Sequence, residues 1–157
     1  MIMKNVETKK ITITKTVEIT QDNLCDVMAI ALEGGIGYWA MLDNASENWT
    51  KWEKKYKAEH PEDEYCSTVE IAAYILWNGG YIEFEDAEEE GVTDLNNEEG
   101  VEGDPWKLTL NRVLEGLGQE MSHSKYDDIE DYLGCYADAE SGDFIIQWAL
   151  FGEIVFG

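Results

Sequence analysis

Apolar and polar residues alternate in the segment "ITITKTVEIT", residues 11–20, where Lys15 is the one polar residue among the odd-numbered positions. Side chains of a β-strand point alternately to its two faces, so this pattern predicts a strand that is buried on one side. Its apolar face consists of Ile11, Ile13, Val17 and Ile19. Two shorter runs, "YIEFE" at 81–85 and "WKLTL" at 106–110, predict two further strands.

Apolar residues three and four positions apart predict helices in the rest of the chain. The first helix begins at a cap, Thr20 or Asp22, and ends or kinks at Gly34-Gly35. A kink or a left-handed turn at this glycine pair would exclude β-branched side chains. The second helix, "SENWTKWEKKYKAEHP", stops at Pro61.

Three more helices are predicted nearer the end of the sequence. The segment "STVEIAAYILW" opens with a capping pair, Ser67 and Glu70, and is apolar all round, so we expect it to be the buried central helix. An amphipathic helix follows over 110–121, and the last helix begins in "DAESGDF" and leads into an apolar, strand-like tail. Together these elements predict one α+β domain spanning residues 1–157, in which a small, mostly antiparallel sheet packs against several helices.

Charge divides the sequence into two unequal parts. Residues 1–57 hold eight lysines and eight acidic residues, whereas residues 58–157 hold three basic and twenty-six acidic residues and account for the whole net charge of −23. A surface that carries charges of one sign destabilises the folded state by self-repulsion, and a partner of opposite charge would relieve this repulsion. Nucleic acid and anionic membranes are therefore poor partners for this protein, and basic proteins are good ones.

The acidic residues are most concentrated between residues 83 and 104, where eleven carboxylates occur without a lysine or arginine. Within this stretch, residues 87–105 form a long excursion between two predicted strands. Loops of this length in a compact domain are usually functional or disordered, although many acidic runs are only a solvated surface. The carboxylates are Glu83, Glu85, Asp86, Glu88, Glu89, Glu90, Asp94, Glu98, Glu99, Glu102 and Asp104.

The spacing of this stretch fits a calcium-binding loop only in part. Asp86, Glu88, Glu90 and Gly91 match positions 1, 3, 5 and 6 of such a loop, but Asn97 occupies position 12, where a bidentate glutamate is required. The two histidines of the chain have no second ligand at zinc spacing. We therefore expect no dedicated metal site.

Motifs of enzyme chemistry are missing from the sequence. It has no glycine-rich nucleotide loop, no nucleophile elbow and no HExxH pair, so we predict a protein without catalytic residues or cofactor. Three widely spaced cysteines and the lack of an apolar leader predict a reduced protein of the cytosol. No apolar run is long enough to predict a membrane span.

Two motifs near the ends of the chain carry a resemblance. "ALEGGIGYW" within 22–39 and "ALFGEIVFG" within 144–157 resemble segments of a family of small, largely uncharacterised acidic proteins of Firmicute phages and prophages. Members share ALEGG-x-x-YW, a central Gly-Gly before a short strand, matched by Gly79-Gly80, and ALFGEI-x-x-G. Residues 43–66 and the acidic stretch depart from this pattern. The resemblance implies an accessory protein of a mobile element and no catalytic residues.

Acidic phage proteins of this kind also resemble, in composition, anti-CRISPR and anti-restriction inhibitors. We therefore predict an inhibitor that binds a basic nucleic-acid-handling enzyme of the host, and the leading candidate for this target is a CRISPR effector such as Cas9. Its carboxylates would steer association, and aromatic anchors would supply affinity. Candidate anchors lie on one stripe of the second predicted helix, a stripe that also fits a helix face turned into the core: Trp49, Trp52 and Tyr56.

Two other functions fit the sequence. A small-molecule sponge or sensor could use the Gly34-Gly35 break, with Tyr38 and Trp39 as the walls of a pocket. The third candidate is a structural or regulatory phage component, since nothing in the sequence distinguishes it from a binding protein.

Overall fold

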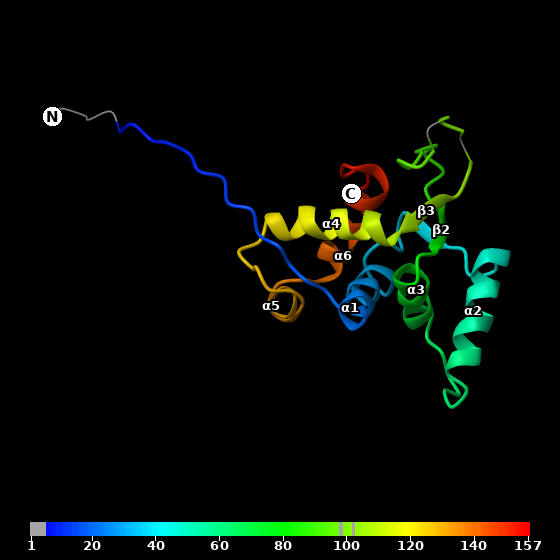
Figure 1. The fold of residues 1–157 in the computed structure, drawn as a ribbon. Coiled ribbons are helices and arrows are strands. Elements are labelled where there is room, and N and C mark those ends of the chain that lie inside the picture. The colour runs from blue at the N-terminus through cyan, green and yellow to red at the C-terminus, as the bar shows by residue number, and fades with distance from the viewer. Residues whose placement is uncertain (1–5, 98, 102) are drawn as a thin grey trace.

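The computed structural model describes residues 6–97, 99–101 and 103–157. Within these residues the chain forms the predicted α+β fold, a single domain of six helices and one three-stranded antiparallel sheet (Figure 1). The elements in chain order are α1 (Gln21–Leu32), β1 (Ala40–Leu42), α2 (Glu47–Glu59), α3 (Thr68–Trp77), β2 (Tyr81–Asp86), β3 (Trp106–Thr109), α4 (Leu110–Ser122), α5 (Ile129–Cys135) and α6 (Ala139–Phe151).

Each helix begins after a residue whose side-chain oxygen accepts a hydrogen bond from a backbone N–H of the first turn. At α1 the bonds are reciprocal: Thr20 Oγ1 accepts from Asn23 N, and Asn23 Oδ1 accepts from Thr20 N. Such bonds satisfy N–H groups that the helix leaves free, which is why these side chains fix where helices start. The caps are Thr20, Ser46, Ser67, Thr109, Asp128 and Asp138.

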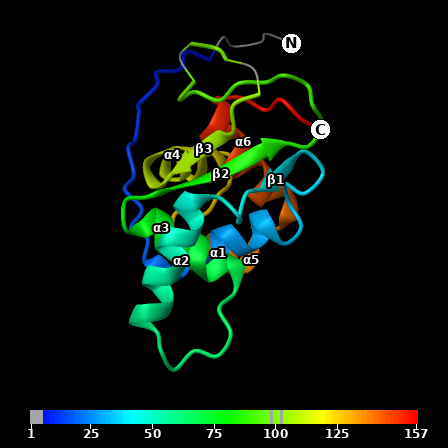
Figure 2. The same ribbon diagram turned by 90° about the vertical axis from the view of Figure 1, so that its right-hand side faces the viewer.

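Strand β2 is the centre of the sheet and pairs antiparallel with β1 on one side and β3 on the other (Figure 2). Both internal strand predictions, at 81–85 and 106–110, are therefore confirmed. Ile82 and Phe84 are fully buried, whereas Glu83 and Glu85 alternate with them and face away from the core. The sheet thus has one covered face and one face that displays carboxylates.

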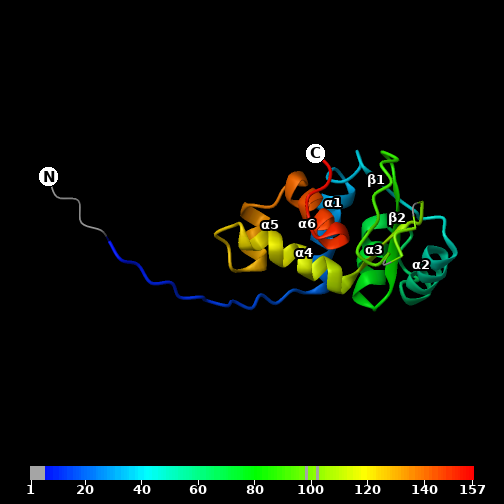
Figure 3. The ribbon, with the colours of Figure 1, turned by 90° about the horizontal axis from the view of Figure 1, so that it is seen from above.

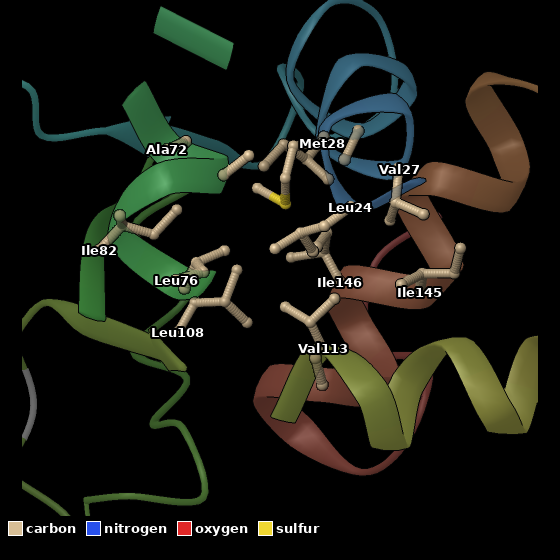
Figure 4. Packing of buried hydrophobic residues seen from close by; sticks show 14 of the residues in the cluster. Leu24, Val27, Met28, Ala72, Leu76, Ile82, Leu108, Val113, Ile145 and Ile146 are labelled. Carbon is tan, nitrogen blue, oxygen red and sulfur yellow. The ribbon is translucent and has the colours of Figure 1, made fainter. Parts of the chain in front are cut away.

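The core lies between the sheet and helices α1, α3, α4 and α6, with α6 packed against both α1 and α4. Figure 4 shows side chains of α1, α3, β2, β3, α4 and α6 meeting there, and all those it labels are completely buried. Helix α3 is buried over most of its length, as its uniform apolar composition predicts. The labelled residues are Leu24, Val27, Met28, Ala72, Leu76, Ile82, Leu108, Val113, Ile145 and Ile146.

Helices α1 and α6 approach closely enough for their backbones to touch. A Cβ atom on Gly142 would lie 2.7 Å from Ala31 N, and one on Gly35 would lie 2.8 Å from Ala139 O. Neither Gly34 nor Gly35 has a positive φ, and a Cβ on Gly34 would meet only Ala139 Cβ, at 3.8 Å. The end of α1 before this pair is as predicted, but the left-handed turn is wrong: only Gly35 is required, and the reason is close packing.

The strand predicted at 11–19 is wrong. Residues 6–19 follow an extended path, but none of their backbone groups is hydrogen-bonded to any other part of the chain that the structure describes. Val17 and Ile19 pack partly against the core, while the chain before them leaves the body of the protein (Figures 1 and 3). Alternation makes a strand only where a neighbouring strand is available, and this fold offers none at that place.

The apolar tail after α6 is not a strand, and of its apolar side chains Phe156 is buried in the core while Ile154 and Val155 are exposed. Gln147 Oε1 accepts the N–H groups of Val155 and Phe156, each at 2.8 Å, and Gln147 Nε2 donates to Phe156 O at 3.1 Å. One side-chain amide therefore takes the place of a neighbouring strand. The Phe156 ring stacks on Trp39, with 5.0 Å between ring centroids.

Candidate functional site

The acidic stretch occupies the outward face of β2 and the loop that follows it. We call its exposed carboxylates the acidic surface: Glu85, Glu88, Glu89, Glu90, Glu99 and Asp104. Glu83 and Asp86 are half-buried beside it. Glu98 and Glu102 lie outside the described residues. Most of the predicted carboxylates that the structure describes thus lie on one side of the sheet and its loop.

Asp94 is the exception, since it is only 6% exposed. Its Oδ2 accepts the backbone N–H of Lys107 at 2.8 Å, and Asn96 Nδ2 donates to the carbonyl of the same Lys107 at 2.9 Å. Together the two side chains satisfy the outward N–H and C=O of Lys107 as a neighbouring strand would, which covers this point on the edge of the sheet. The carboxylate of Asp94 is therefore used within the fold, and in this conformation Asp94 is not among the predicted partner-binding carboxylates that the surface displays.

The excursion over 87–105 is anchored to the body at its middle. Trp106 Nε1 donates to Val92 O at 2.8 Å, and Leu95 N donates to Leu150 O, also at 2.8 Å. These bonds divide the excursion into two shorter acidic turns on either side of a fixed centre. Carboxylates on anchored turns keep their positions better than those on a free loop, which favours recognition of a partner.

The two acidic turns border a hollow of about 470 Å³. Asp86 Oδ1 accepts the N–H of Glu88, and Glu89 has a positive φ of 52°, which turns the chain back at this point. In the part of the chain that the structure describes, no three His, Cys, Asp or Glu side chains are arranged to hold a metal ion. The hollow is lined by Glu85, Asp86, Glu89, Gly91, Val92, Gly103, Asp104 and Pro105.

The acidic surface has almost no positive charge near it. Among the described residues, none of its carboxylates takes part in an ion pair. Lys107, opposite Glu83 in the sheet, places its Nζ 4.9 Å from the centre of the Tyr81 ring. The field of the carboxylates is therefore not neutralised within the described chain, and a basic partner would experience it in full.

The aromatic stripe of α2 faces the interior. Trp49 is 2% and Tyr56 6% exposed, and half-buried Trp52 covers Gly80, where a Cβ would lie 2.7 Å from the Trp52 ring. Trp49 and Tyr56 are thus core side chains and Trp52 packs against the edge of the core, which is the alternative that the stripe also fitted; in this conformation Trp49 and Tyr56 are not displayed to a partner. The exposed side of α2 instead carries Lys51, Lys54, Lys55 and Lys57.

Tyr56 of α2 and Tyr74 of α3 pack edge to face, and their ionisation will make the stability of the fold depend on pH. Burial, and hydrogen bonds to Glu70 and Glu59 respectively, raise the pKa of each phenol from 10.0 to about 12. The unfolded chain loses these protons first, so the stabilisation is complete below pH 10 and disappears as the pH approaches 12. The free energy of unfolding should fall over this range by up to ~1.4 kcal/mol per pH unit for each tyrosine.

Urea unfolding at a series of alkaline pH values will measure this slope. Tyr56→Phe removes one titrating group and should flatten the slope, whereas Tyr65→Phe alters a tyrosine that is 84% exposed and should not. Equal slopes in the two variants would show that Tyr56 ionises alike in the folded and unfolded chains.

Tyr38 and Trp39, the walls of the pocket in the sponge hypothesis, are directed at a carboxylate instead. Tyr38 OH donates to Asp143 Oδ2 and Trp39 Nε1 donates to Asp143 Oδ1, both at 2.7 Å. Gln147 Nε2 also donates to Asp143 Oδ1, at 2.8 Å, and the Trp39 side chain is completely buried. The two motifs near the ends of the sequence therefore meet around one buried aspartate.

This cluster could not be found from the sequence as a site, because Tyr38 and Trp39 lie more than a hundred residues from Asp143 and no local pattern pairs them. A hollow of about 400 Å³ does lie beside the turn after α1, but neither Tyr38 nor Trp39 lines it. Tyr38 and Trp39 therefore stabilise the fold through their hydrogen bonds to Asp143.

Comparisons of this chain with family models, with curated proteins and with solved structures found no match. In the described residues, every helix is too short or too polar to cross a lipid bilayer.

Proposed function

We propose that this protein is a binding inhibitor without enzymatic activity, whose acidic surface docks on a basic nucleic-acid-handling protein. The observation that carries the proposal is the set of exposed carboxylates on an anchored loop, with no ion-pair partner among the described residues. A fold that keeps such repulsion in one place is stabilised when a cationic surface covers it. A nucleic-acid-binding groove is a cationic surface of this kind.

The resemblance of the two end motifs supplies the biological setting of the proposal. A phage or prophage protein acting in the cytosol of a bacterial host would meet defence enzymes that bind nucleic acid through basic grooves. The target we propose is a CRISPR effector nuclease such as Cas9, whose heteroduplex channel is positively charged. The protein would compete with the nucleic acid for that surface.

Affinity requires apolar contacts in addition to charge, because solvated charges at the rim of an interface contribute little. With Trp49 and Tyr56 buried, the exposed apolar residues beside the carboxylates take over this role. Met41 is 56% exposed and lies opposite Glu85 in the sheet, and Leu95 and Val101, on the loop itself, are 44% and 45% exposed. We propose these three side chains as the contacts that hold the complex once charge has steered it together.

Capture experiments with the tagged protein in host lysate at low salt will test the proposal, followed by cleavage assays with the purified nuclease. We expect a basic nuclease or helicase to be retained, to elute with salt, and to lose activity when the protein is added. Retention of acidic or neutral proteins alone, or a bound nuclease with undiminished activity, would contradict the proposal.

Charge removal in the loop will separate specific steering from general acidity. The variant Glu88→Gln, Glu89→Gln, Glu90→Gln should slow association with the captured nuclease about three- to tenfold at low salt, and leave dissociation less changed. The difference from the unmodified protein should shrink as salt screens the charges. Surface plasmon resonance across a salt series measures both rates.

The matched control is the variant Glu62→Gln, Asp63→Asn, Glu64→Gln, which removes three consecutive exposed carboxylates between α2 and α3. Its net charge equals that of the loop variant. If the two variants slow association equally, total charge alone guides the partner and the acidic surface has no special role.

A further inference from the structure

The segment from Lys9 to Ile19, which we call the arm, has the sequence pattern of a β-strand. No strand among the described residues pairs with it. Its backbone makes no hydrogen bond to any other described residue, and Ile11 and Ile13 are 84% and 71% exposed. Figures 1 and 3 show the arm running away from the helices. Exposed, unpaired backbone with β-branched residues on one face is a template for another strand.

A groove lies where the arm meets the body. Its volume is about 560 Å³, and Lys15 Nζ binds Asp127 Oδ2 at 2.7 Å at its side. Leu114 of α4 opens into it and is 40% exposed, so the groove leaves apolar surface of α4 in contact with water. The apolar side chains that line it come from the arm and from α4: Ile13, Val17, Ile19, Leu114, Leu117 and Met121.

We propose that the arms of two copies of this chain pair with one another as an antiparallel two-stranded ribbon, with Thr14 opposite Thr14 on the two-fold axis. This register places Lys10 opposite Glu18, Ile11 opposite Val17 and Thr12 opposite Thr16, each twice, and sets the stems of Lys15 and Lys9 against Ile13 and Ile19. Opposite charges, β-branched pairs and threonine pairs are the cross-strand contacts that stabilise a ribbon. A shift that puts Lys15 on the axis would instead place like charges opposite each other.

The groove gives the ribbon the support that two strands alone lack. Side chains at odd-numbered positions of the arm share one face, and on that face Val17 already contacts the core. In the proposed register Ile11 of the second copy lies beside Val17, above the exposed Leu114. Each copy thus covers part of the apolar groove of the other, and the contact is isologous, as a two-fold dimer requires.

Charge complementarity with a second copy is local to the arm. Lys9 and Lys15 bind Glu7 and Asp127 of their own chain, which leaves Lys10 to pair with Glu18 of the second copy. The two Lys10–Glu18 pairs join the arms, while the bodies, with a net charge of −23 per copy, repel one another. Dimerisation should therefore strengthen as salt screens the bodies, whereas binding of the basic partner proposed above should weaken.

Sedimentation equilibrium of the full chain will test the dimer. The variant Ile11→Ser, Ile13→Ser removes the apolar face of the arm and should weaken dimerisation about a hundredfold. Thr12→Ser, Thr14→Ser changes the same number of neighbouring positions on the other face and should weaken it only a few-fold. All four side chains are exposed in the single chain, so the helical circular dichroism of both variants should equal that of the unmodified protein.

Disulfide trapping will test the register. In a Cys135→Ser background, which removes the exposed native thiol, Thr14→Cys should give a cross-linked dimer rapidly under mild oxidation. Thr16→Cys alone should not, but mixed with Thr12→Cys it should give the heterodimer. A chain that stays monomeric up to millimolar concentration, a dimer indifferent to the isoleucine changes, or trapping at Thr16 alone as fast as at Thr14 would each overturn the proposal.

Discussion

Replacing Gly116 by alanine will lower the free energy of unfolding by about 3 kcal/mol, although alanine is the better helix former. Gly116 lies in α4 where the helix crosses α6, and a Cβ there would be 2.2 Å from Ile145 O and 3.0 Å from Ala149 N. Both atoms belong to the backbone of α6, so no side-chain rotation relieves the overlap. The two helices must separate, and the packing of the core between them is lost.

Gly118, two residues further along the same helix, provides the matched control. It is exposed, and a Cβ there would meet nothing within 4 Å. Gly118→Ala should therefore raise the free energy of unfolding by up to ~1 kcal/mol through helix propensity alone. Urea unfolding followed by circular dichroism measures both variants. Effects of the same sign at the two positions would show that α4 and α6 are not in backbone contact at Gly116.

The parts of the fold that the sequence predicts well are those in which the signal and the structure are local. Helix starts are one example, because the side chain of Ser67 bonds a backbone N–H only three residues away. The apolar run of α3 is another, since a helix with no polar face must be buried. Two short elements, β1 and α5, span 3 and 7 residues and carry too little periodicity to be found this way.

The predictions that failed depend on a partner elsewhere in the chain. The alternation at 11–19 says that a strand could form, but not whether a second strand lies beside it. The tail after α6 satisfies its N–H groups with the side chain of Gln147, which no strand pattern reveals. The stripe of Trp49 and Tyr56 shows that α2 has an apolar face, and only the fold decides that this face turns inward.

The candidate site divides along the same line. Its carboxylates are evident from composition, and their exposure could be expected because charged side chains are rarely buried without a partner. Asp94 has such a partner, the backbone of β3, thirteen residues away along the chain. The role of Asp143 likewise cannot be predicted from the local sequence, because two of its hydrogen-bond donors, Tyr38 and Trp39, lie more than a hundred residues away.

Asp143→Ala will reduce the free energy of unfolding by about 3 kcal/mol or more, since it removes the acceptor of three hydrogen bonds. Asp143 is only 6% exposed, and the Trp39 side chain is fully buried, so water cannot replace the lost carboxylate without opening the core. Gln147 would also lose the contact that orients it toward the tail. Urea unfolding will give the loss of stability, and near-ultraviolet circular dichroism will report the changed environment of Trp39.

Glu140→Ala is the control for the loss of a negative charge from the same helix. Glu140 is exposed in the first turn of α6, and its removal should cost at most ~1 kcal/mol, through the helix dipole. Asp143→Asn keeps the size of the side chain but presents an N–H₂ group to donors, so its loss of stability should fall between those of the two alanine variants. If Asp143→Ala unfolds no more easily than Glu140→Ala, the aspartate does not join the two end motifs, and their meeting in the fold must depend on packing contacts such as those of Trp39 with Phe151 and Phe156.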